Sequence, residues 1–354
     1  MPDTIRSIDL SRINGPQAWT GRQQAERGDW SYTLTENDIA EIDAALARVR
    51  DIDILEIDRA VFPLPGLSAR LGTVKREILD GRGFYLFRGL PINHYSIAEA
   101  ARIFWGIGAH WGEAVSQNGK GHVLGHVKDL GLDYADPMAR GYQTNARLPF
   151  HTDSSDIVGL LCLNTSKRGG YSSIVSTTTI YNEMVARRPD LAAVLMQPLH
   201  RTRWGEVPEG RKPYYGTAPF NLTNGRLICT YVRSAVRKAQ LMDAVPRLTS
   251  EQVEAMDLFD ELANDPILHL DMELLPGDMQ FVCNHAIAHS RTAYEDHPEP
   301  EIRRHLLRLW LACPDGPKLP PAYTGEHQGK TASGRPDGIK VPGVPLIAPL
   351  EADA

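Results

Sequence analysis

Residues 148–164 read LPFHTDSSDIVGLLCLN and set a histidine and two aspartates directly before an apolar run. The run, residues 157–163, is typical of a strand that is buried on both faces. Charged side chains are costly beside such a strand unless they are paired or bind a metal. If residues 151–153 continue as a strand, His151 and Asp153 point to the same side, because alternate residues of a strand share a face. We therefore expect this stretch to build both a sheet and one half of a metal site.

The chain from about residue 120 onward consists of short apolar or β-branched runs separated by Gly, Pro and Asn. Besides the opening stretch, these runs are GHVLGHV (121–127), YSSIVST (171–177), RLICTYV (226–232), MELLPGDMQFVCN (272–284) and HLLRLWLAC (305–313). Many short strands joined by turns are typical of an antiparallel sandwich or barrel, whereas regular alternation of strands and helices is typical of a parallel sheet. The sequence therefore predicts a mainly β fold with flanking helices.

The first third of the chain is patterned for helices. Thr35 and Ser96 each stand three residues before an acidic residue and open an apolar run at helical spacing, which is the signature of a capping box. Further helices are expected over residues 67–79, 183–197 and 249–265. We expect three regions, and these are a helical N-terminal extension over residues 1–80, a β domain over 81–315 and a Pro- and Gly-rich tail over 316–354 that wraps the surface.

Composition limits the partners and the location of the protein. A net charge of −6 gives no support for binding to nucleic acid. No apolar run approaches the ~20 residues that a spanning helix needs, and the first residues lack the basic and apolar pattern of a secretory signal. The four cysteines are widely spaced, which favours reduced thiols over a disulfide framework or a thiolate metal site. We expect a cytoplasmic protein that binds neither nucleic acid nor a membrane, and leave a homo-oligomer open.

His151 and Asp153 supply two of the three ligands of a 2-His-1-carboxylate iron site. Alone, the pattern is weak, because HLD at residues 269–271 places His269 and Asp271 in the same way. A surface pair or an oriented core histidine would also explain either copy. A distant second histidine is needed to complete the site.

The third ligand is offered by His285 or His289, both within PGDMQFVCNHAIAHSRTAYED (276–296). Several strands fit between Asp153 and these histidines, so they can return to the first half-site across a barrel. His269 and Asp271 lie so close before His289 that only one hairpin fits between them. We therefore regard them as the poorer half-site.

Two arginines follow in RRHLLRLWL (303–311). On a strand, Arg304 and Arg308 share a face, with Leu306 between them. Guanidinium forks that point into a barrel need anions, and their geometry suits carboxylates. The other explanation is that both arginines pair with Asp or Glu of the protein itself.

Taken together, these motifs resemble the taurine dioxygenase/TfdA-type family of iron(II)- and 2-oxoglutarate-dependent oxygenases. The resemblance covers roughly residues 80–312 and rests on FHTD (150–153), GGYSSIVS (169–176), PGDMQF (276–281), NHAIAHSRTAYED (284–296) and RRHLLRLWL (303–311). It implies a double-stranded β-helix, the jelly-roll barrel, with helices packed outside. It also implies that His151, Asp153 and His289 bind iron(II), with His285 a neighbour.

The resemblance further implies a cosubstrate site and a substrate site. Ser172 and Arg304 match the positions that hold the far carboxylate of 2-oxoglutarate, although threonine is commoner at the first. Arg308 matches a position that grips an acidic group of the primary substrate in several members. In YQTNARLPF (142–150), just before the ligand strand, the candidate substrate contacts are Gln143, Asn145 and Arg147, although these side chains would equally well shape a polar loop.

Three protein ligands leave iron three positions, two for 2-oxoglutarate and one for O₂. The expected reaction is hydroxylation of a C–H bond of a small anion-bearing substrate, such as an amino acid derivative. Desaturation, ring closure and epimerisation use the same residues, whereas the carboxylate of Asp153 argues against halogenation. The polar and aromatic segment 200–216 is a candidate lid. The alternative is a cupin-like metalloprotein that does not use 2-oxoglutarate, but it gives no reason for Arg304 and Ser172.

Overall fold

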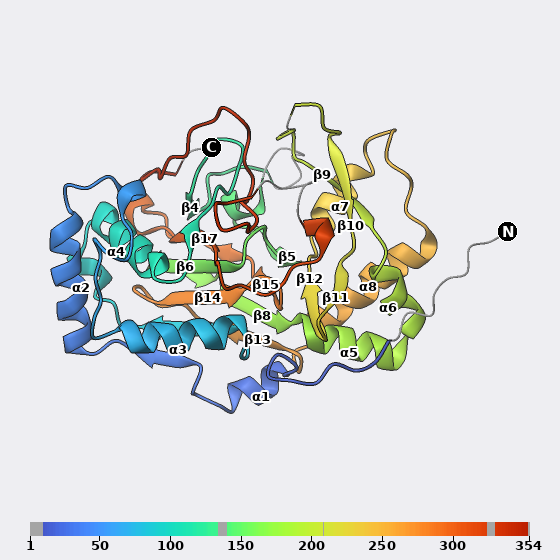
Figure 1. Ribbon diagram of the computed structural model, residues 1–354, viewed down its shortest axis with the longest axis horizontal. Coiled ribbons are helices and arrows are strands. Elements are labelled where there is room, and N and C mark those ends of the chain that lie inside the picture. Colours follow the sequence, from blue (N-terminus) through green and yellow to red (C-terminus); the bar gives the residue numbers. More distant parts are fainter. Residues whose placement is uncertain (1–9, 134–139, 208, 324–329, 353–354) are drawn as a thin grey trace.

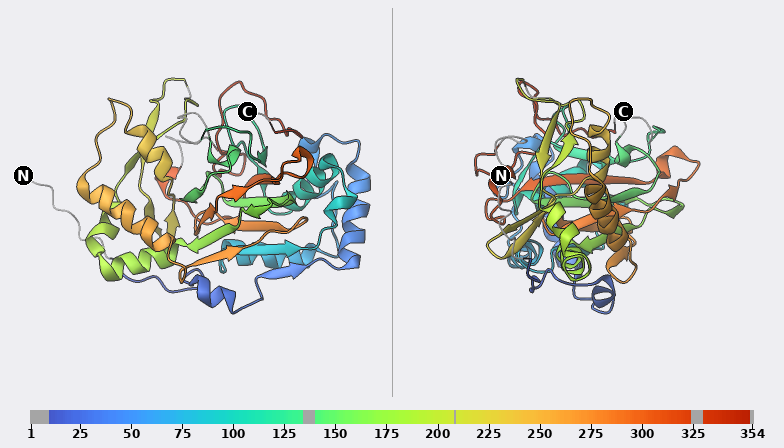
Figure 2. Two further views of the ribbon diagram at one scale, coloured as in Figure 1. Left: turned by 180° about the vertical axis from the view of Figure 1, so that it is seen from behind. Right: turned by 90° about the vertical axis from the view of Figure 1, so that its right-hand side faces the viewer.

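The computed structural model describes residues 10–133, 140–207, 209–323 and 330–352 of the chain. Strands from distant parts of the sequence lie side by side in the middle, and helices cover both ends (Figures 1 and 2). The helices are α1 (Gly21–Ala25), α2 (Glu36–Val49), α3 (Ser68–Leu79), α4 (Ile97–Ala109), α5 (Thr177–Arg187), α6 (Pro189–Leu195), α7 (Arg233–Ala239) and α8 (Ser250–Ala263). The prediction of a β fold with flanking helices is confirmed at this level.

The larger sheet of the described residues has seven strands. In spatial order they are β1 (Ser31–Thr33), β2 (Phe84–Arg88), β14 (Met279–Cys283), β6 (Ile157–Asn164), β17 (His305–Ala312) and β3 (Glu113–Ala114), with β4 (Leu124–Val127) also paired to β17. The apolar run of the opening stretch is β6, a central strand between β14 and β17. Gly159 is required there, because a Cβ atom would lie 2.7 Å from the ring of Phe281.

The smaller sheet carries two of the predicted metal ligands. Its order is β13 (His269–Met272), β8 (Ser172–Ser176), β15 (Ile287–Arg291) and β5 (Leu148–His151). The antiparallel register of β15 and β5 sets His289 opposite His151. Further two-stranded pairs are β9 (Leu199–Thr202) with β10 (Tyr214–Thr217), β11 (Phe220–Thr223) with β12 (Arg226–Cys229), and β7 (Arg168–Gly169) with β16 (Tyr294–Glu295).

Two apolar clusters anchor the sheets to the helices. The first joins the larger sheet to α2, α3 and α4 and contains Phe84, Phe104 and Phe281. The second joins the smaller sheet to α5, α6 and α8 and contains Tyr181 and Phe259. Burial of such side chains is the main favourable term in folding, and the first cluster also contains Ile174 and Ile287 of the smaller sheet, so it holds the two sheets together.

The structure corrects several expectations at the level of single elements. The helix expected over 183–197 is broken into α5 and α6, because Pro189 has no N–H to continue the first helix and pushes Arg188 out of helical geometry. The helix α7 was not expected. None of the described helices combines the length and the apolar character that a membrane crossing requires.

The N- and C-terminal regions both contact the β strands. Strand β1 pairs in parallel with β2 and so joins the larger sheet. The tail expected to wrap the surface forms bridges from Gly338 to Ser116 and from Ile347 to His122. Its Arg335 side chain is buried, so the tail is part of the packed molecule as well as its covering.

Candidate metal centre

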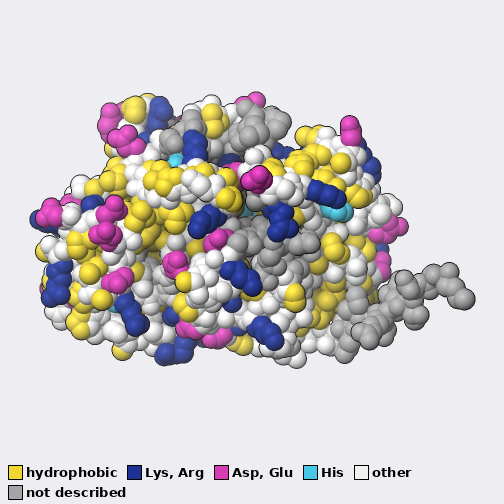
Figure 3. All heavy atoms as spheres, turned by 45° about the horizontal axis from the view of Figure 1, so that its top comes forward, with side chains coloured by type: hydrophobic (Ala, Val, Ile, Leu, Met, Phe, Trp, Pro, Cys, Tyr) yellow, Lys and Arg dark blue, Asp and Glu magenta, His cyan; other side chains and the backbone are white. Residues whose placement is uncertain are grey.

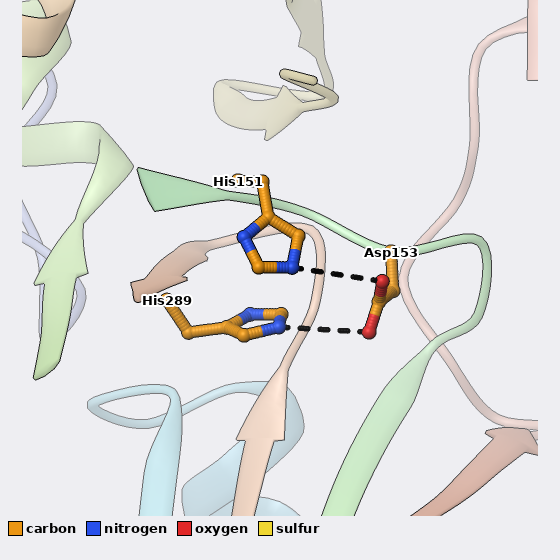
Figure 4. Close-up of side chains that lie close together, drawn as sticks. All are labelled: His151, Asp153 and His289. Carbon is orange, nitrogen blue, oxygen red and sulfur yellow. Dashed lines mark ion pairs between the residues drawn. The ribbon is translucent and has the colours of Figure 1, made fainter. Parts of the chain in front are cut away.

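The opening stretch places His151 at the end of a strand and Asp153 in the turn that follows. Asp153 lies two residues beyond β5 and so not on the strand that the alternation predicted. Asn284 fixes this turn, since its Oδ1 accepts the Asp153 N–H (2.6 Å) and its Nδ2 donates to the Asp153 carbonyl (2.7 Å). The carboxylate and both imidazoles, the second from His289, point toward one another (Figure 4).

The three side chains form a compact group of potential ligand atoms. His151 Nε2 lies 3.9 Å from Asp153 Oδ1, and His289 Nε2 lies 3.5 Å from Asp153 Oδ2. Among the His, Cys, Asp and Glu side chains of the described residues, these three form the group in which one potential ligand atom of each lies within 4.8 Å of the others. A metal that bonds each ligand atom at about 2.1 Å can be shared by atoms roughly 3–4 Å apart. Two imidazoles and one carboxylate are the donor set of non-haem iron(II) oxygenases.

Burial and neighbouring charges set the protonation of this group. Burial, followed by His289, lowers the pKa of His151 to about 4, so its imidazole is neutral at neutral pH. Burial alone would raise the pKa of Asp153, but Arg308 and the two histidines lower it below its ordinary value. A neutral imidazole and an ionised carboxylate are the forms that bind a metal.

Two further contacts orient these side chains. His151 Nδ1 donates to the Pro149 carbonyl (2.8 Å), which leaves Nε2 for a metal. The Trp310 indole N–H donates to Asp153 Oδ2 (3.0 Å). Sequence reasoning missed Trp310, although its place two residues after Arg308 on the same strand face was a usable signal.

His285 does not take part in this group, as the resemblance implied. Its Nε2 donates to Asp156 Oδ1 (2.7 Å). The same carboxylate accepts the Cys313 N–H (2.8 Å) and the Nε (2.8 Å) and Nη2 of Arg335. Burial alone would raise the pKa of Asp156, but His285 and Arg335 lower it to about 2. This buried cluster ties the C-terminal tail to the loop that carries Asp153.

The rival pair His269 and Asp271 lies apart from the group. Their closest approach is 3.6 Å, and the Asp271 side chain is 56% exposed. Its carboxylate accepts the hydroxyl of Ser173 on the neighbouring strand. The structure therefore places this second copy of the motif on β13, outside the metal group.

Arg308 lies beside the metal group. Its Nη1 is 3.9 Å from Asp153 Oδ2, and its Nε donates to Gln117 Oε1 (2.7 Å). The Gln117 amide in turn donates to the Arg308 carbonyl (2.9 Å). The guanidinium also stands over the rings of Tyr142 and Trp310, 4.6 and 5.0 Å from their centroids. Gln117 was missed, and no feature of its sequence neighbourhood pointed to it.

Arg304 precedes β17, so it is not on the strand as expected, yet its side chain is buried. No carboxylate of the described residues lies within ion-pair distance of it, and its Nη1 has no hydrogen-bond partner there. Burial lowers its pKa. It borders a small cavity of about 170 Å³ together with Gly170, where a Cβ atom would lie 2.9 Å from the Arg304 Nε. Ser172 is also buried, and its hydroxyl donates to Gln280 Oε1 (2.8 Å).

A much larger cavity of about 940 Å³ borders the metal group. Its lining includes His151, Asp153 and Arg308. The outer wall comes from the β9–β10 hairpin, from α7 and from residues 337–342 of the tail. The segment 200–216 expected as a lid thus forms a hairpin in this wall.

The structure does not bring Gln143, Asn145 and Arg147 into the lining of this cavity. Asn145 and Arg147 are exposed, and Arg147 donates to the side chain of Asn264 on the outside. Gln143 closes a short 3₁₀ turn, where its side chain accepts the Arg140 N–H (3.4 Å). The same turn contributes different side chains to the cavity, namely those of Arg140 and Tyr142.

Comparisons with known proteins agree with this geometry. Residues 50–310 match the Taurine catabolism dioxygenase TauD, TfdA family. The FR-33289 synthase of Streptomyces rubellomurinus (strain ATCC 31215) is 32% identical over 333 residues, which is 92% of this chain and 97% of that protein.

Solved structures show the same fold. An asparagine oxygenase in complex with Fe(II), 2S,3S-3-hydroxyasparagine and succinate has a TM-score of 0.62 at 16% identity, covering 80% of this chain and 93% of that one. The non-heme iron oxygenase OrfP in complex with Fe and alpha-ketoglutaric acid has a TM-score of 0.59 at 14% identity, over 80% and 93% of the two chains. The chain therefore belongs to the TauD/TfdA family and is an iron(II)- and 2-oxoglutarate-dependent dioxygenase that uses O₂.

Proposed function

We propose that this enzyme binds iron(II) through His151, Asp153 and His289 and oxidises a C–H bond of a small anion-bearing molecule. The observation that carries the proposal is the close group of these three side chains, of which His151 and Asp153 line a large cavity together with Arg308. Hydroxylation is the reaction we favour. The relation of the two sheets supports a jelly-roll barrel, with residues 1–80 as an extension, 81–315 as the catalytic domain and 316–354 as the tail.

The site for 2-oxoglutarate is formed by Arg304 and Ser172. Arg304 fits a dicarboxylate, because it is a buried cation whose Nη1 lacks a partner in the described residues. When bound, iron with 2-oxoglutarate and O₂ supplies the oxidising power, and succinate and CO₂ leave.

Arg308 holds the negative group of the primary substrate. It faces the metal group, and no carboxylate other than Asp153 comes within 4 Å of it in the described residues. A desolvated guanidinium beside one shared carboxylate favours an incoming anion. The structural neighbour with 3-hydroxyasparagine supports an amino acid derivative as that anion. The burial of all four cysteines as free thiols supports a cytoplasmic enzyme.

One experiment distinguishes the proposed dioxygenase from the alternative, a cupin-like protein that does not use 2-oxoglutarate. Purified protein is given iron(II), 2-oxoglutarate and O₂ without a primary substrate, and succinate is measured. We expect slow succinate formation that requires all three additions. His289→Ala should abolish both this activity and iron(II) binding, whereas His269→Gln should leave both within about threefold. Iron binding without succinate formation would favour the alternative, and loss of iron in His285→Ala but not in His289→Ala would contradict the ligand assignment.

A further inference from the structure

The outer wall of the large cavity is strongly cationic in a protein whose net charge is −6. Six of its basic side chains are Arg201, Arg203 and Arg211 of the β9–β10 hairpin, Arg237 and Lys238 of α7, and Lys340 of the tail. Figure 3 shows the face on which these segments lie, with Lys and Arg side chains around its middle. Basic side chains from three separate segments converge here, so the local charge is opposite to that of the whole chain.

The acidic side chains that line the same cavity do not balance this charge. In the described lining they are Asp153, Glu206 and Asp337. Asp153 belongs to the metal group. The Glu206 carboxylate forms an ion pair with Arg140 and accepts the Gly119 N–H (2.6 Å). Even if Asp337 neutralises one cation, a surplus of positive charge remains, and such a surplus concentrates anions.

Arg201 is a buried cation of this wall. It is only 2% exposed, and its Nη1 and Nη2 donate to the side chain and the carbonyl of Thr230. Its Nε has no partner, and no carboxylate of the described residues lies within ion-pair distance. A buried cation that lacks a counter-charge is costly, so a ligand with negative charge would compensate it.

Trp204 holds the neighbouring cations in place. Its backbone adopts φ 55°, a left-handed conformation that is rare for a bulky side chain. The Lys238 ammonium stands 4.1 Å from the centroid of its ring, and the Arg140 guanidinium stands 5.7 Å away. The indole therefore links α7 to the hairpin and fixes the spacing of their charges.

We propose that this wall binds a phosphorus oxyanion, a phosphate ester or a phosphonate, at the end of the substrate far from the metal group; this rests on the proposed function. A single carboxylate offers one pair of oxygens and one charge, which Arg308 alone can satisfy. A phosphoryl or phosphonyl group offers three oxygens and, once its second proton has left, two charges, which suits cations that converge from several directions. The substrate is then anchored at two ends, with the reacting C–H bond between them.

The test is calorimetric titration of protein loaded with iron(II) and 2-oxoglutarate under anaerobic conditions. The probes are propylphosphonate, butyrate of the same chain length, and uridine monophosphate. We expect the phosphonate to bind at least tenfold more tightly than butyrate. Its affinity should rise between pH 6 and pH 8 as the second proton leaves, whereas that of butyrate should not. Tighter binding of the nucleotide than of the small phosphonate would identify a phosphate ester as the source, and the reverse would identify a phosphonate.

Variants separate the wall from the rest of the cavity. The double variant Arg237→Gln/Lys238→Gln should lose at least tenfold in phosphonate affinity, and Arg201→Gln should do the same if it folds. The control Arg187→Gln, an exposed residue of α5 that pairs with Glu183, should bind as the wild type does. Equal binding of butyrate and phosphonate, or unchanged affinity in the double variant, would overturn the inference. Succinate formation by the wild type is measured in parallel, because its loss would instead overturn the proposed function.

Discussion

At the scale of single residues, Arg304 allows a direct test of the cosubstrate site. Its charge is buried without a carboxylate partner in the described residues. Truncating one partner of a buried charge pair costs about 2–5 kcal/mol. We predict that Arg304→Ala raises the KM for 2-oxoglutarate at least tenfold, with Arg304→Lys intermediate. Steady-state succinate formation at varied 2-oxoglutarate measures this. An unchanged KM would mean that another cation holds the cosubstrate.

Trp310 is predicted to act through Asp153. Its N–H holds one carboxylate oxygen, and loss of such an outer contact typically lowers metal affinity 10- to 100-fold. Trp310→Phe keeps the ring and removes the donor, so iron(II) should bind at least tenfold more weakly while the far-ultraviolet spectrum stays the same. Competition with a metal-sensitive dye measures the affinity, and Trp105→Phe serves as the control, because its indole N–H donates to the Ile57 carbonyl and not to Asp153. Equal iron affinity in both variants would exclude this positioning role.

At the scale of elements, Arg335 joins the tail to the loop that carries Asp153 and Asp156. Breaking a buried ion pair costs about 3–5 kcal/mol, and His285 and the Cys313 N–H still contact Asp156. Arg335→Gln should therefore lower the free energy of unfolding by about 3 kcal/mol, and thermal unfolding followed by calorimetry measures it. Arg187→Gln is the surface control, with a change below about 1 kcal/mol. A loss no larger in Arg335→Gln than in the control would mean that the tail contributes nothing through this contact.

Local patterns were predictable, and contacts between distant segments were not. The capping boxes of Thr35 and Ser96 were read correctly, because they depend on residues three positions apart. The close approach of His151, Asp153 and His289 agrees with the family resemblance, although Asp153 reaches the group from beyond the strand and not by strand alternation. The placement of Gln143, Asn145 and Arg147 could not be predicted, because it depends on how a loop turns over the cavity.

The same distinction explains the residues that were missed. Gln117 contacts Arg308, 191 positions away, and Arg335 contacts Asp156, 179 positions away. Such contacts arise from packing between distant segments, and no local spacing in the sequence predicts them. Arg304 and Asp153 were expected on strands and lie just outside them, because strand ends are set by hydrogen bonds with neighbours and not by alternation alone. Residue types thus predicted the chemistry, whereas the neighbours decided the geometry.

At the scale of the whole molecule, a buried histidine pair makes the fold sensitive to acid. Burial, followed by His126 and Lys128, lowers the pKa of His305 to about 3. His126 Nε2 donates to the Pro349 carbonyl (2.9 Å), so its Nδ1 accepts the His305 Nε2–H (2.8 Å). Because the folded pKa is below the unfolded value of about 6.5, stability is fully present above pH 6.5 and falls as pH drops toward 3.

At pH 5 the loss from His305 alone should be about 2 kcal/mol relative to pH 7.5. Urea unfolding at the two pH values measures it, and His305→Gln, which stays neutral, should show a loss smaller by about that amount. The same pH dependence in both proteins would assign the acid sensitivity to other groups.

The large cavity is lined by two groups of residues that come from different parts of the fold. The residues that would hold iron and 2-oxoglutarate lie on or beside the sheets, whereas the cationic wall belongs to a hairpin, a short helix and the tail. Substitutions of the basic side chains of the wall, which contact neither Thr152 nor Asp156, can therefore accumulate while the metal group stays in place. A lineage of such enzymes can diversify in what it accepts while conserving how it reacts, and chimaeras that exchange only residues 201–215 and 337–342 between relatives should inherit the preference of the donor.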